Sequence, residues 1–220
     1  MHALNQRRSF VMGLCCAPLV AAAQAPSAPQ PGVDYVVLDR PQPPLEAGDI
    51  RIEVVDFFGY WCPHCFEFVN DLEAWRKRLL SDTAYMHVPV AFNPSENPLS
   101  MTFYSLQTLG RLEDMHLKVF RAIHIDRKKL FETNDIADFV AANGIDRDKW
   151  LSVYNSFSVA SAVNRANQLW QNYRIDGTPT LACDGRFLTS PSIAHNGGNA
   201  AALAVMDYLL ERVRRERKKK

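Results

Sequence analysis

One segment of the chain leads from an apolar strand through a Cys-x-x-Cys turn into a helix: Ile50-Arg51-Ile52-Glu53-Val54-Val55-Asp56-Phe57-Phe58-Gly59-Tyr60-Trp61-Cys62-Pro63-His64-Cys65. Its first nine residues are mostly β-branched or aromatic and end in a near-continuous apolar run, which is typical of a central strand covered on both faces. Gly59 ends that run. From Phe66 to Leu79, apolar residues then recur every three or four positions, which predicts an amphipathic helix. We therefore expect strand, turn and helix, with Cys62 at the helix N-terminus.

That position suits thiol chemistry. Pro63 fits the first helical position, because its missing N–H would have no partner there. Free backbone N–H groups and the positive end of the helix dipole stabilise a thiolate at Cys62, which is the nucleophile in disulfide exchange. His64 can add a positive charge or a hydrogen bond, and Cys65, one turn further on, is the resolving cysteine. A stabilised thiolate favours the reduced form, so the Cys62–Cys65 disulfide is expected to be a strong oxidant.

Two other uses of the cysteines fit less well. A zinc knuckle needs two further ligands at suitable spacing, but the sequence contains no second Cys-x-x-Cys, and Cys183 stands alone. A purely structural disulfide seldom spans two residues at the start of a helix. The pattern therefore favours a redox-active pair and no bound metal.

Residues 1–25 have the layout of a secretory signal peptide. Arg7 and Arg8 precede an apolar stretch over 10–20, and small residues allow cleavage after about position 23 or 25. The two arginines also fit a twin-arginine signal, which would export a folded protein. A lipoprotein signal at Cys15 or Cys16 fits less well, because no small residue precedes the cysteine. Export would place the mature chain, with three cysteines left, where disulfides persist.

Composition limits the remaining classes. The chain has 220 residues, 47% of them hydrophobic and 22% charged, with a formal net charge of +1. This suits one well-packed domain and excludes a disordered chain. The last ten residues hold seven basic and two acidic side chains, so the body of the protein is acidic and nucleic-acid binding through a basic face is not expected. The basic end is interpreted as the solvated end of a helix over 199–213; contact with an anionic membrane is the alternative.

A family resemblance joins these features. The segment Phe57-Phe58-x-x-Trp61-Cys62-Pro63-His64-Cys65 resembles the active-site segment of the DsbA family of periplasmic thiol:disulfide oxidoreductases. Gly177-Thr178-Pro179-Thr180 is similar to that family's cis-proline loop, and Asn155-Ser156-Phe157 to the end of its helical insertion. The resemblance covers most of residues 33–215. It implies an α/β protein with a thioredoxin fold and an inserted all-helical subdomain.

The domain boundaries follow from that expectation. Residues 26–98 and 166–220 are expected to form the thioredoxin-like domain, and residues 99–165 the inserted helical subdomain. The helical pattern from about Leu99 to Tyr173 agrees with this division. Asp184-Gly185 predicts a two-residue hairpin turn between two late strands.

The resemblance also implies roles for substrate-binding residues. Pro179 is expected to be cis and to lie opposite Cys62, while Thr178 presents backbone groups to an extended substrate. The apolar surface around Tyr60, Trp61 and Pro179 would bind unfolded chains with little sequence preference. Thr178 departs from the family pattern, in which many members carry valine, so the oxidising strength does not carry over directly.

Asp56 occupies the place of a family acid that lies beneath the active site and exchanges a proton with Cys65. Burial there would favour its neutral form. The family's pairing lysine is missing, because residues 84–92 contain none, so a proton-relay role for Asp56 is an open expectation. The alternative is an exposed carboxylate at the strand end.

The histidines outside the motif, at 87, 116 and 124, are interpreted as ordinary strand or helix-face residues, and Cys183 as a small buried hydrophobe.

The sequence thus predicts a periplasmic dithiol oxidase that introduces disulfide bonds into exported proteins. Its partners would be reduced or unfolded exported proteins and, by resemblance, a DsbB-type membrane quinone reductase that reoxidises the Cys62–Cys65 disulfide. We expect a monomer with no cofactor besides that disulfide. The alternatives are a disulfide reductase or isomerase of the same fold, or a metal-binding or chaperone module that uses the Cys-x-x-Cys as soft ligands.

Overall fold

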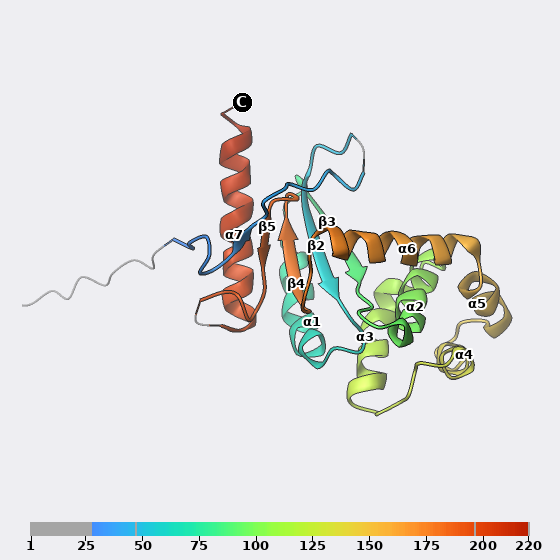
Figure 1. Ribbon diagram of the computed structural model, residues 1–220. Helices are drawn as coiled ribbons and strands as arrows, with labels where there is room; N and C mark the ends of the chain where they lie inside the picture. The colour runs from blue at the N-terminus through green and yellow to red at the C-terminus, as the bar shows by residue number, and fades with distance from the viewer. Residues whose placement is uncertain (1–27, 47, 196, 220) are drawn as a thin grey trace, which may run out of the picture.

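A five-stranded sheet lies at the centre of the fold (Figure 1). The computed structural model describes residues 28–46, 48–195 and 197–219, and the predicted signal peptide at 1–25 lies outside these ranges. The strands follow the order β1-β5-β4-β2-β3 across the sheet. Their bounds are β1 Val36–Val37, β2 Ile52–Phe58, β3 Thr83–Pro89, β4 Thr180–Cys183 and β5 Phe187–Thr189.

The predicted central strand is β2. It pairs in parallel with β3 and antiparallel with β4, and all seven of its residues are buried. Alternate side chains point to opposite faces of a strand. Accordingly Ile52 and Val54 pack in the cluster that contains α7, whereas Val55 and Phe57 pack with Tyr173 on the other face. Coverage on both faces explains why the segment is so apolar.

Helix α1 (Pro63–Arg76) leaves the C-terminal end of β2 through a four-residue turn. Cys62 is its N-cap, and the Cys62 side chain accepts a hydrogen bond from the backbone N–H of Cys65. The predicted apolar spacing began at Phe66, but the structure buries Phe68 more deeply. Phe66 stacks on His124 with 5.1 Å between ring centroids instead. The difference arises because two surfaces cover α1, the sheet and the helical segment.

The helical segment between β3 and β4 contains five α-helices (Figure 1). They are α2 Asn97–Thr108, α3 Leu112–His124, α4 Thr133–Ala142, α5 Arg147–Tyr154 and α6 Phe157–Asn172, preceded by a short 3-10 turn, η1 Pro94–Glu96. A continuous buried cluster joins Cys62, Cys65 and Val69 to Met115 and Phe120 of α3. The helical segment is therefore packed directly against the Cys-x-x-Cys turn. The boundary expected between residues 165 and 166 falls inside α6.

The late strands form the expected hairpin, but its loop has three residues instead of the predicted two, because Cys183 pairs with Phe187 and Arg186 joins Asp184 and Gly185 in the turn. The value of φ is positive at Asp184 and Gly185. The final helix, α7 (Gly198–Arg217), packs on the sheet face that α1 also covers. Its basic end differs from the solvated tail that was expected. Arg214 pairs with Asp82 at 2.8 Å and Arg217 with Asp184 at 2.6 Å, so these arginines bind the ends of the sheet. Among the described residues, no helix is long and apolar enough to cross a membrane.

Candidate active site

Cys62 and Cys65 are free thiols at the N-terminus of α1. The Cys62 sulfur lies 3.2 Å from the carbonyl oxygen of Thr178, to which it donates a hydrogen bond when it is protonated, and the Cys65 backbone N–H lies 3.4 Å from the same sulfur. A hydrogen bond from the Cys65 side chain lowers the Cys62 pKa to about 6, although burial opposes this shift. Hydrogen bonds from Thr178 and from backbone N–H groups lower the pKa further. At neutral pH Cys62 is therefore mostly a thiolate, the reactive form.

Cys65 lies on the inner side of the turn and has the opposite character. Burial, followed by the hydrogen bond and negative charge at Cys62, raises its pKa well above the usual value. The pair thus consists of one thiolate and one thiol that share a hydrogen bond. Such an asymmetry suits a nucleophile next to a resolving cysteine that must lose its proton before it reacts.

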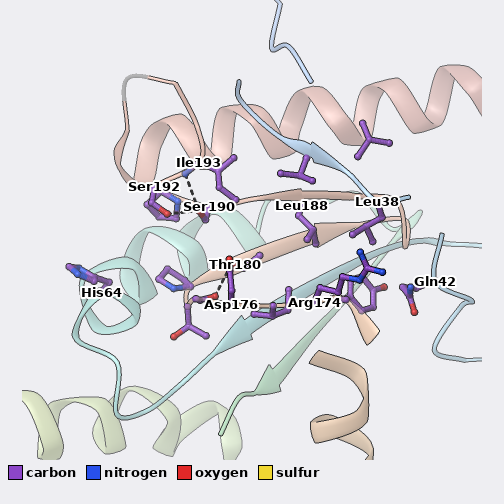
Figure 2. Close-up of a pocket in the computed structure, with 18 of the residues that line it drawn as sticks. Leu38, Gln42, His64, Arg174, Asp176, Thr180, Leu188, Ser190, Ser192 and Ile193 are labelled. Atoms are coloured by element: carbon purple, nitrogen blue, oxygen red, sulfur yellow. Dashed lines mark hydrogen bonds between the residues drawn. The ribbon is translucent and has the colours of Figure 1, made fainter. Parts of the chain in front are cut away.

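The side chain of His64 is exposed and lies at one end of a groove (Figure 2). Its Nδ1 atom lies 3.0 Å from Glu67, and this hydrogen bond, with a smaller contribution from the charge at Cys62, raises the His64 pKa. Only the backbone N–H of His64 contributes a hydrogen bond to the Cys62 thiolate. A stabilising effect of the side chain would therefore act through charge. Pro63 occupies the first helical position and is exposed.

Of the two aromatic residues before Cys62, Tyr60 is buried and Trp61 is partly exposed. Tyr60 is 1% exposed and its hydroxyl lies 2.8 Å from Nδ1 of His116, so it contributes no surface to substrate, unlike the expectation. The reason is that the helical segment covers the Tyr60 side of the turn. Trp61 is partly exposed, and its indole N–H donates to the carbonyl of Val90 at 3.0 Å. A Cβ at Gly59 would lie 2.5 Å from the indole, which explains the glycine there.

The Thr178–Pro179 peptide bond is cis and precedes β4. This loop lines an open groove of about 1130 Å³ that extends from His64 to the edge strand β1 (Figure 2). The apolar part of the groove is lined by Leu38, Ile175, Leu188 and Ile193. The nucleophilic sulfur therefore lies against a backbone carbonyl at the margin of a long, partly apolar groove, which is an arrangement that can hold an extended peptide.

A buried charged cluster lies beneath the cysteines. The Asp56 side chain is 3% exposed, so the alternative of an exposed strand-end carboxylate is wrong. Its Oδ2 atom lies 2.8 Å from Nδ1 of His87, and its Oδ1 atom has no hydrogen-bond partner in the part of the chain that the structure describes. Asp56 and Cys65 line the same small cavity of about 10 Å³, the volume that one water molecule needs.

The sequence interpretation missed His87 and Glu73. His87 is the register partner of Asp56 in the parallel β2–β3 pair, and its Nε2 atom lies 3.3 Å from Glu73 of α1. Burial opposes the charged imidazole, but hydrogen bonds to Asp56 and Glu73 prevail and raise the His87 pKa to about 9. The cation beside Asp56 is therefore a histidine. Its only signal in the sequence was a polar residue in an otherwise buried strand, which does not reveal its partner.

His116 also differs from its interpretation as a solvated helix residue. It is buried within 4.8 Å of the His87 ring, centroid to centroid, and burial lowers its pKa well below the usual value. His116 is thus neutral and His87 charged, although the two rings are neighbours.

Cys183 is buried in β4, as expected, and burial raises its pKa to about 12.

Comparison with known proteins agrees with this arrangement. The family model of the DSBA-like thioredoxin domain matches residues 77–196. The thiol:disulfide interchange protein DsbA of Bordetella parapertussis is 42% identical over 216 residues, which cover 96% of this chain and 100% of the relative. The protein of the same description from Pseudomonas aeruginosa is 36% identical over 188 residues, which cover 86% of this chain and 87% of the relative.

A solved structure gives the same result. The crystal structure of Pseudomonas aeruginosa DsbA matches with a TM-score of 0.80 at 35% identity, over 85% of this chain and 95% of that one. The chain belongs to the DsbA-like thioredoxin-domain family. It is a disulfide oxidoreductase of the thiol:disulfide interchange type, with the expected α/β fold.

Proposed function

We propose that this protein is a periplasmic dithiol oxidase that introduces disulfide bonds into exported proteins through Cys62 and Cys65. The observation that carries the proposal is the pKa difference within the pair, about 6 at Cys62 against a raised value at Cys65. A thiolate that is stabilised in the reduced enzyme makes reduction of the enzyme favourable, and hence oxidation of the substrate.

The reaction proceeds in two exchanges. A substrate thiolate attacks the Cys62 sulfur of the Cys62–Cys65 disulfide, which forms a mixed disulfide and releases Cys65 as a thiolate that takes up a proton. A second substrate thiolate attacks the substrate sulfur of the mixed disulfide and releases Cys62 as a thiolate. The substrate loses two electrons and the enzyme gains them. A DsbB-type membrane quinone reductase would take these electrons and restore the disulfide.

Each site residue has a part in this proposal. Thr178 and Pro179 hold an extended substrate across Cys62, and the exposed part of Trp61 provides apolar contact. Asp56 exchanges the proton of Cys65, which the small cavity between them supports. His64 contributes positive charge near the thiolate. The enzyme acts as a monomer, with its disulfide as the sole redox group, on unfolded or reduced proteins that reach the periplasm with it.

The redox equilibrium with glutathione tests the direction of the reaction. A potential of about −120 mV, the value of DsbA, would support the oxidase, whereas about −270 mV, the value of thioredoxin, would indicate a reductase. Cys62→Ser should abolish exchange, and Cys183→Ser, which removes an equally buried thiol, should leave it unchanged. Tight stoichiometric zinc binding without exchange would instead favour the metal-binding module.

A further inference from the structure

The strongest unassigned feature is the charged cluster around His87, which links β2, β3, α1 and α3. Asp56 contacts one ring nitrogen and Glu73 approaches the other, at 2.8 and 3.3 Å. Arg76 contacts Glu73 at 2.7 Å on the outer side of the cluster. The cluster thus leads from the buried Asp56, 3% exposed, to the side chain of Glu73, 26% exposed.

The groups that face His87 define its charge. Besides the two carboxylates, the ring meets the hydroxyl of Tyr85, 3.5 Å from Nδ1, and the neutral ring of His116. Neither of these carries a charge at neutral pH, because burial raises the Tyr85 pKa and lowers the His116 pKa. Arg76, which contacts Glu73 and Glu113, is the other cation of the cluster. His87 is therefore the cation that directly contacts Asp56.

We propose that His87 is a positioning residue that pairs with Asp56 as a cation and so sets the pH dependence of proton transfer at Cys65. Glu73 supports it as an ion-pair partner, because its Oε1 atom lies 3.3 Å from the second ring nitrogen of His87. A carboxylate buried without a cation is expensive and takes up a proton. Only the ionised Asp56 can accept a proton across the cavity it shares with Cys65. This inference rests on the proposed function.

The step that depends on this arrangement is the attack by Cys65. When reduced enzyme meets oxidised glutathione, the Cys62 thiolate first forms a mixed disulfide and releases one glutathione thiolate. Cys65 then loses its proton to Asp56 and attacks the Cys62 sulfur, which releases the second glutathione and forms the Cys62–Cys65 disulfide. His87 takes no part in the first step and controls the second through Asp56.

The experiment measures both steps against pH with oxidised glutathione, by acid quenching and mass spectrometry. In His87→Gln, we expect the first step to keep its wild-type pH profile. The second step should be about tenfold slower at pH 7, the effect of one unit of mismatch in proton affinity, and should recover as the pH rises. His87→Lys, which keeps a cation in this place, should restore most of the rate.

A matched control separates charge from packing. His116→Gln alters a neighbouring buried histidine that is neutral and has no carboxylate partner in the described part of the chain, and it should leave the profile of the second step unchanged. Glu73→Gln, at a less buried position, should also slow the second step, by a smaller factor than His87→Gln. This variant tests the inference if His87→Gln does not fold.

An unchanged or faster second step in the His87 and Glu73 variants would overturn the inference. The same shift in His116→Gln, or no restoration by His87→Lys, would also overturn it. In each of these cases the first step at Cys62 would still proceed, so the proposed function would stand. Loss of the first step in the wild-type enzyme would count against the proposed function instead.

Discussion

The sulfur of Cys62 lies 3.2 Å from the carbonyl oxygen of Thr178, a residue 116 positions further along the chain. The contact joins the N-terminus of α1 to the cis-proline loop before β4. It places the nucleophile against a backbone edge at the margin of the groove. An extended substrate that pairs with this edge would bring its own sulfur to Cys62, so binding and chemistry depend on the same contact.

The reactivity of Cys62 should follow its low pKa. We expect the alkylation rate of the reduced protein by iodoacetamide to rise with pH around a midpoint of about 6, because only the thiolate reacts. Mass spectrometry should find the label on Cys62 alone, since the pKa values of Cys65 and Cys183 are raised. A midpoint near 9 would contradict the stabilised thiolate, and Cys62→Ser should remain unlabelled.

The stability of the reduced protein should depend on pH in one direction. The Cys62 pKa is about 6 in the folded protein against an ordinary value of 9.0, so the unfolded chain binds more protons between these values. The free energy of unfolding therefore rises with pH above about 6, by up to about 1.4 kcal/mol per pH unit, and the gain is lost as the pH falls through 6.

Urea unfolding of the reduced and oxidised forms at pH 5, 6, 7 and 8 measures this effect. The oxidised form has no thiol at position 62 and serves as the control. The difference in stability between the two forms should widen from pH 6 to pH 8. A constant difference would show that the Cys62 thiolate gains nothing from the folded structure.

Thr178→Val should weaken the oxidant. The Thr178 side chain contributes to the lowered pKa of Cys62, so its removal should raise that pKa and bring the redox potential closer to that of glutathione. Besides Cys62, the buried Thr178 hydroxyl has no hydrogen-bond partner among the described residues, so the free energy of unfolding should change little. The ultraviolet absorbance of the thiolate against pH measures the shift. Thr180→Val is the matched control. The Thr180 hydroxyl donates to the carbonyl oxygen of Gly177 at 2.8 Å, so its removal should leave the Cys62 pKa unchanged.

Tyr60→Phe should affect stability and not substrate binding. The substitution removes the hydroxyl that lies 2.8 Å from His116 and leaves a buried ring nitrogen unpaired, which costs about 1–3 kcal/mol. Thermal unfolding should detect the loss. The KM for oxidation of a reduced peptide should remain unchanged, because Tyr60 has no exposed surface in the groove. A raised KM without loss of stability would restore Tyr60 as a substrate-binding residue.

Much of the site could be predicted because its interactions are local. The apolar run before Gly59 indicated β2, and the spacing after Cys65 indicated α1. Placing Cys62 at a helix N-terminus needed only these two elements. The Asp184-Gly185 turn was likewise a local signal, since both residues tolerate a positive φ. The pattern was less accurate for Phe66, because periodicity assumes one buried face and α1 has two covered sides.

The residues that were misread all depend on contacts between distant segments. His87 looked ordinary until the parallel register of β2 and β3 placed it beside Asp56. Tyr60 looked like surface until the helical segment covered it. The arginines of α7 looked like a free tail until the sheet brought Asp82 and Asp184 within reach.

The sequence by itself determined the nucleophile, because the pKa of Cys62 is lowered mainly by Cys65, three residues further on, and by backbone N–H groups of the same helix. Tertiary structure alone decided what surrounds that nucleophile. Strand register placed His87 against Asp56, and the return of the chain at β4 placed Thr178 against the Cys62 sulfur. Local propensity acts over a few residues, whereas register and packing depend on the burial of a whole apolar surface. The residue pattern of one segment therefore does not predict which distant segment will pack against it.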